Sequence, residues 1–104
     1  MGERRKMLMI YLDETDTAGD VPLYEAIVRR LVRLDVAGAT VHAGIMGYGS
    51  QHHVHRKRLF GVSDDRPVTI TAIDTEDKIR AAAAEIRPMV SEGLLALVDV
   101  EIVS

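Results

Sequence analysis

The 104-residue chain contains no cysteine and no tryptophan, and aromatic residues make up only 4% of it. The absence of cysteine excludes disulfides, thiolate metal sites and thiol catalysis together, and it fits a reducing, cytoplasmic location. Because aromatic rings are scarce, the hydrophobic residues, which are 47% of the chain, must form an aliphatic core. The sequence also lacks a long apolar run, so we expect no signal peptide and no direct insertion into a membrane.

The chain has neither a large net charge nor a recognisable catalytic motif. The formal net charge is −3, which argues against a general affinity for nucleic acid. RNA binding through aromatic stacking is disfavoured too, since Tyr11 is the only aromatic residue in the first expected strand. There is no nucleophile elbow, no HExxH motif and no P-loop lysine. We therefore expect neither a nucleic-acid partner nor enzymatic activity.

Hydrophobic periodicity divides the chain into a flexible N-terminal tail, residues 1–6, and a single domain, residues 7–104. Strands are expected at residues 7–12, 39–45, 68–73 and 94–103. A first helix begins after Pro22 and is expected to end at Gly38, and its apolar positions recur at helical spacing at Leu23, Ile27, Leu31 and Leu34. A second helix is capped by Asp74 and Thr75, and Pro88 and Gly93 mark its exit.

This order, βαββαβ, predicts an α+β, ferredoxin-like fold with a four-stranded antiparallel sheet and two helices on one face. The first and last strands are apolar on both sides, although two helices can cover only one face of the sheet. We expect the second face, to which we assign Leu97, to be buried by self-association.

Residues 43–60 gather most of the residues with chemical character. Gly44, Gly47 and Gly49 are expected to turn with positive φ and to aim backbone N–H groups at an anion. The basic triplet Arg56, Lys57 and Arg58 follows and is suited to neutralising a phosphate.

The same stretch holds three histidines. His53 and His55 share one side of an extended segment, where His52 can join them around a metal ion. The spacing matches no established zinc pattern, so solvent-exposed histidines on a loop are the alternative interpretation. Asp13, Glu14 and Asp16 form an acidic group that we expect to be a solvated loop.

The βαββαβ order with a long, glycine-led loop resembles the PII-like signalling superfamily. The run from Val41 to His55, followed by Pro67 and by Asp74-Thr75-Glu76, more closely resembles the DUF190 branch of that superfamily. In that branch the distinguishing run is G-I-M-G, then Phe or Tyr, then Gly, and here it stands at residues 44–49. The resemblance extends from about Leu8 to Val103.

The resemblance implies a homotrimeric signalling protein with a nucleotide cleft between subunits. It also implies that the loop after the second strand contacts a partner, either a membrane transporter or channel or a regulated enzyme. PII proteins carry G-x-G-x-Q at the base of that loop, and Gly47, Gly49 and Gln51 keep this spacing. The implied ligand is an adenine nucleotide or another small anionic metabolite, with no obligatory cofactor. A protein-interaction module without a ligand is the alternative.

Overall fold

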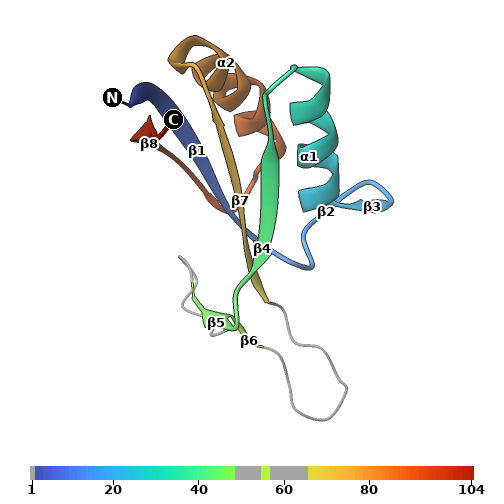
Figure 1. Ribbon diagram of the computed structural model, residues 1–104. Coiled ribbons are helices and arrows are strands. Elements are labelled where there is room, and N and C mark those ends of the chain that lie inside the picture. Colours follow the sequence, from blue (N-terminus) through green and yellow to red (C-terminus); the bar gives the residue numbers. More distant parts are fainter. Residues whose placement is uncertain (1, 49–54, 57–65) are drawn as a thin grey trace.

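The computed structural model describes residues 2–48, 55–56 and 66–104, and it shows the expected α+β fold (Figure 1). The main elements in chain order are β1 (Glu3–Asp13), α1 (Leu23–Arg33), β4 (Ala39–Ala43), β7 (Pro67–Asp74), α2 (Glu76–Ile86) and β8 (Leu94–Ile102). Short elements lie between them: the pair β2 (Thr17–Ala18) and β3 (Val21–Pro22), the pair β5 (Met46–Gly47) and β6 (His55–Arg56), and the 3-10 turn η1 (Arg87–Met89).

The four long strands form one antiparallel sheet in the order β4-β7-β1-β8. Both helices cover the same face of this sheet (Figure 1). The prediction of a ferredoxin-like βαββαβ fold is therefore confirmed.

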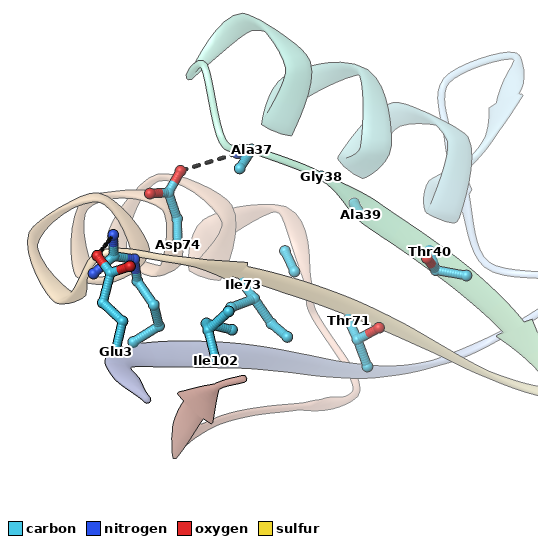
Figure 2. Close-up of a pocket in the computed structure, with 11 residues that line it drawn as sticks. Glu3, Ala37, Gly38, Ala39, Thr40, Thr71, Ile73, Asp74 and Ile102 are labelled. Atoms are coloured by element: carbon cyan, nitrogen blue, oxygen red, sulfur yellow. Dashed lines mark hydrogen bonds and ion pairs between the residues drawn. The ribbon is translucent and has the colours of Figure 1, made fainter. Parts of the chain in front are cut away.

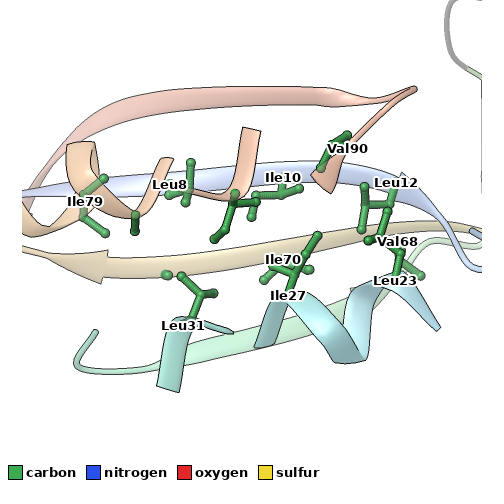
Figure 3. Close-up of a cluster of buried hydrophobic side chains, with 13 residues drawn as sticks. Leu8, Ile10, Leu12, Leu23, Ile27, Leu31, Val68, Ile70, Ile79 and Val90 are labelled. Carbon is green, nitrogen blue, oxygen red and sulfur yellow. The ribbon is translucent and has the colours of Figure 1, made fainter. Parts of the chain in front are cut away.

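The core lies between the helices and the sheet and is entirely aliphatic (Figure 3). Its buried side chains come from alternate positions of β1 and β7, from one stripe of each helix and from the residue after η1: Leu8, Ile10, Leu12, Val68, Ile70, Ala72, Leu23, Ile27, Leu31, Ile79, Ala82, Ile86 and Val90. Each large side chain of this kind contributes about 1.5–3 kcal/mol when fully buried.

The first strand begins at Glu3, four residues earlier than the sequence predicts. The prediction of a flexible tail is therefore wrong for residues 3–6, which pair with β8 in register from Glu3 opposite Ile102. Ion pairs join Arg5 to Glu3 and Lys6 to Asp99, and the side chain of Lys6 is only 15% exposed. Charged residues continue the strand here because they find partners on the same strand and on β8.

The helix ends agree with the sequence in one case and differ in the other. The predicted cap at Thr75 is confirmed, since its hydroxyl accepts a hydrogen bond from the backbone N–H of Lys78 at 3.4 Å. The prediction that Gly38 ends α1 is wrong. Asp35, with φ of 59°, takes the left-handed conformation that terminates the helix, and Val36 N–H donates back to the carbonyl of Leu31 at 3.2 Å.

Asp74 ties the turn before β4 to the start of α2. Its carboxylate accepts the backbone N–H of Thr75 at 2.7 Å and that of Ala37 at 2.9 Å. The hydrogen bond from Thr75 lowers the pKa of Asp74 below its ordinary value, and the bond from Ala37 acts in the same direction. The charged form of this carboxylate therefore stabilises the fold.

We expect Asp74→Asn to lower the free energy of unfolding by about 1–2 kcal/mol at pH 7, because two charge-assisted hydrogen bonds are weakened. Since the folded-state pKa is depressed, the contribution is complete above the ordinary value of about 3.9 and is lost as the pH falls below it. Urea unfolding at pH 7 and pH 3 measures both effects. Asp77→Asn, a substitution at an exposed position in the first turn of the same helix, serves as the control. It should change the free energy of unfolding by about 0.5 kcal/mol or less. An equal loss in both variants would contradict this role for Asp74.

The face of the sheet away from the helices, called here the open face, is apolar along much of β1 and β8. Met9 stands opposite Ala96 of β8 and Thr71 of β7, and residues that stand directly opposite each other share a face of the sheet. This register identifies the strand positions on the open face. They include Met7, Met9 and Tyr11 on β1, and Leu94, Ala96, Val98, Val100 and Ile102 on β8.

Leu97 does not lie on the open face, so our assignment of this residue was wrong. It stands opposite Leu8 in the register and packs against the buried core. The residues of β8 alternate between two apolar sides, as predicted, but the side that contains Leu97 faces the helices and not the open face.

Candidate functional site

The segment that leaves β4 and the segment that enters β7 meet at Pro67, at one end of the sheet. The N–H of Gly44 donates to the carbonyl of Pro67 at 2.6 Å. A Cβ atom at Gly44 would lie 2.8 Å from Cγ of Pro67, and one at Gly47 would lie 3.2 Å from the same atom. A side chain at position 44 would thus overlap the proline ring, and position 47 packs tightly on the same ring. We call Gly44, Gly47, Arg66 and Pro67, with Glu14, the base site.

The prediction of positive φ at Gly44 and Gly47 is wrong. In the described part of the chain, the glycines with positive φ are Gly19 and Gly93. Gly47 instead lies in β5 and pairs with His55 of β6. The base site is therefore a compact junction of extended segments that glycine allows to approach closely, and not a turn built on left-handed glycines.

Arg66 and Glu14 complete the junction, and our sequence analysis did not identify this pair. The N–H of Glu14 donates to the carbonyl of Arg66 at 2.8 Å. The guanidinium in turn donates to both carboxylate oxygens: Nη2 to Oε1 at 3.1 Å, and Nε to Oε2 in a short ion pair. The hydrogen bond with Glu14, and then its negative charge, raises the pKa of Arg66, so the guanidinium stays protonated. Our prediction that Glu14 belongs to a solvated loop is therefore incomplete, because the Glu14 carboxylate is paired with Arg66.

Gly93 shapes the neighbouring turn, between η1 and β8. Its φ is 150°, and a Cβ atom there would lie 2.4 Å from the carbonyl oxygen of Tyr11. Nη1 of Arg87 donates to the carbonyl of Val90 at 2.7 Å and holds the approach to this turn. The turn is thus packed on the end of β1, at the same end of the sheet as Pro67, which pairs with Asp13.

Three large apolar side chains on β5 and directly beside it are exposed, close in sequence to Gly44 and Gly47 of the base site. Ile45 is 87% exposed, Met46 61% and Tyr48 69%. Large apolar side chains that cluster in solvent are typical of surfaces that contact another molecule.

Most of the other predicted site residues lie outside the described part of the chain: Gly49, Gln51, His52, His53, Lys57 and Arg58. For His55 and Arg56 the structure gives the backbone, which pairs with Met46 and Gly47. Their ligand and metal roles remain predictions. Within the described ranges, no group of three or more His, Asp or Glu residues is placed to hold a metal ion.

A surface hollow of about 680 Å³ lies elsewhere, at the end of β7 that carries Asp74 (Figure 2). Its lining includes Thr40, Thr71, Ile73 and Ile102 together with the charged residues Glu3 and Arg5. This hollow is wide open and shares no residue with the base site. We therefore assign no function to it.

In the described residues, no helix combines the length and the apolar character that crossing a membrane requires.

Comparison with known proteins gives a family and a fold. The family model DUF190, described as "Uncharacterized ACR", matches residues 5–102. A UPF0166 protein of Aquifex aeolicus is 32% identical over 100 residues, which cover 96% of this chain and 94% of that protein.

Two solved structures share the fold at low sequence identity. CPII, a nitrogen regulatory PII-like protein of Thiomonas intermedia, superposes with a TM-score of 0.74 at 22% identity, covering 98% of this chain and 91% of CPII. A putative PII-like signaling protein of Thermus thermophilus gives 0.73 at 14% identity, covering 98% and 92%. The chain therefore belongs to the DUF190 family and has the fold of the PII-like proteins.

Proposed function

We propose that this protein is a PII-like regulatory protein that binds an adenine nucleotide at the base site and passes its binding state to a partner protein. The observation that carries the proposal is the junction at Pro67, where Gly44 and Gly47 pack on the proline ring and the protonated Arg66 directly precedes it. Such a junction holds a positive charge at one end of the sheet, where a phosphate group can pair with it.

The choice of nucleotide is supported by the fold relative CPII, whose structure contains ADP, AMP and bicarbonate. The predicted ligand residues Gly49, Gln51, Arg56, Lys57 and Arg58 belong to this proposal as further contacts to the anion. In this function the protein acts as a cytoplasmic regulator and not as an enzyme.

Self-association is part of the proposal. The open face carries Met7, Met9, Val98 and Ile102, yet no helix of the described chain covers it. An apolar sheet face of this kind is stabilised by burial, and a closed ring of three copies buries it in each subunit. We propose a homotrimer.

A ligand-free interaction module is the second candidate, and it is favoured by the exposed side chains of Ile45, Met46 and Tyr48. The same side chains serve the first proposal as the contact to a partner, either a membrane transporter or channel or a regulated enzyme. The two candidates differ in whether a small ligand is required.

Isothermal titration of the whole protein with ADP, AMP, ATP, cyclic dinucleotides and oxo-acids separates the two candidates. We expect an adenine nucleotide to bind with a Kd below about 1 mM, that is, more tightly than about −4 kcal/mol. Gly44→Val should abolish the binding because its side chain would displace Pro67. If no compound of the panel binds below millimolar concentration, the interaction module is the better account.

A further inference from the structure

Arg66 is held in one orientation from a distant part of the chain. Glu14 lies 52 residues away in sequence, and the two residues share a backbone hydrogen bond and a two-pronged contact between guanidinium and carboxylate. The side chains are 32% and 28% exposed, so the pair is partly shielded from water. A bidentate pair of this kind fixes the plane of the guanidinium as well as its position.

The contact with Glu14 uses only one edge of the guanidinium, formed by Nε and Nη2. Among the residues that the structure describes, Glu14 is the one that accepts hydrogen bonds from this side chain. Arginine carries five N–H donors, so an oriented group remains available to a second anion.

We propose that Arg66 is a phosphate-binding residue of the base site and that Glu14 is the residue that positions it. This inference rests on the proposed function. Arg66 directly precedes Pro67, whose carbonyl accepts the N–H of Gly44, so its charge is attached to the junction itself. The phosphate of a nucleotide, or free inorganic phosphate, provides the matching acceptor oxygens.

A carboxylate beside an anion site has two opposite effects. It lowers the positive potential that attracts the phosphate, and it removes the need to order a long side chain during binding. The geometry favours ordering as the dominant effect, because Glu14 reaches Arg66 through its backbone as well as its side chain. Glu14 would then strengthen phosphate binding even though it is itself negative.

The test compares Arg66→Gln, Arg66→Lys and Glu14→Gln in titrations with ADP and with inorganic phosphate. We expect Arg66→Gln to weaken ADP binding about 10-fold or more and to reduce its salt dependence, since a charge-assisted hydrogen bond is lost. Arg66→Lys should recover only part of the affinity, because an ammonium cannot be held in two-pronged fashion. Glu14→Gln should weaken binding about 3-fold, and inorganic phosphate should follow the same order as ADP.

Arg80→Gln is the matched control. Arg80 makes an Nε contact to Glu76 at 2.8 Å on the exposed face of α2, and neither residue belongs to the base site. This variant should leave the affinity unchanged.

The outcomes separate the two levels of the proposal. If the wild type binds ADP and Arg66→Gln binds it equally well, the phosphate role of Arg66 is wrong while the proposed function stands. Tighter binding by Glu14→Gln would show that Glu14 competes with the ligand and does not position Arg66. A wild type that binds neither ADP nor phosphate contradicts the proposed function and this inference together.

Discussion

Val98→Asp is expected to convert the proposed trimer into a folded monomer with the 11.5 kDa mass of one chain. Val98 lies on the open face of β8, where it is 39% exposed in the single chain and would be covered in a trimer. An aspartate at a covered position has to lose its hydration without gaining a partner, which disfavours the assembled state by several kcal/mol. Light scattering gives the mass, and circular dichroism shows whether the fold is kept.

Leu97→Asp is the paired variant on the other side of the same strand. Leu97 packs against the core beside Leu8, so we expect a loss of about 2–4 kcal/mol in the free energy of unfolding. The two neighbouring substitutions should therefore give different failures, dissociation at 98 and unfolding at 97. A wild-type mass for folded Val98→Asp would contradict assembly through the open face.

Gly93→Ala is expected to lower the free energy of unfolding by about 3 kcal/mol. The φ of 150° is unfavourable for any residue with a Cβ atom, and that atom would lie 2.4 Å from the carbonyl oxygen of Tyr11 and 2.8 Å from Cγ1 of Val90. Backbone strain of this kind costs about 1–3 kcal/mol, and the steric overlap adds to it. Chemical unfolding of the variant and the wild type measures the difference.

Gly38→Ala is the control for this substitution. Nothing lies within 4 Å of a Cβ atom at Gly38, so we expect no loss and a gain of up to about 1 kcal/mol from the stiffer unfolded chain. If Gly93→Ala were as stable as Gly38→Ala, the close approach of the turn to β1 would not be required.

The order of elements could be predicted because the signals for it are local. Leu23, Ile27 and Leu31 repeat at helical spacing. Thr75 caps α2 by accepting a hydrogen bond from the backbone N–H of Lys78, which is close in sequence. The face of β8 could not be predicted in the same way. Both sides of that strand are apolar, so the alternation fits either face, and only the pairing of Leu97 with Leu8 settles which one is buried.

The base site was predictable only in part. The glycine run lies at the base site, but Gly44 and Gly47 pack against the ring of Pro67, roughly 20 residues further along the chain, and this contact leaves no local signal. The contact between Glu14 and Arg66 gave no local signal, since each residue alone is a common charged residue in a loop. The early start of β1 was missed because residues 3–6 have no apolar pattern, and Glu3, Arg5 and Lys6 find ion-pair partners on the same strand and on β8.

Titration of isotope-labelled protein with ADP, followed by amide resonances, tests the central claim most directly. The backbone N–H of Gly44 is bonded to Pro67 inside the base site, whereas Thr40, Thr71 and Asp74 line the hollow toward the opposite end of β7. Our account predicts that ADP shifts the resonances of Gly44, Gly47 and Arg66 and leaves those of Thr71 and Asp74 in place. Shifts gathered around Thr71 and Asp74, with Gly44 unchanged, would place the ligand in the hollow and contradict the assignment of the base site.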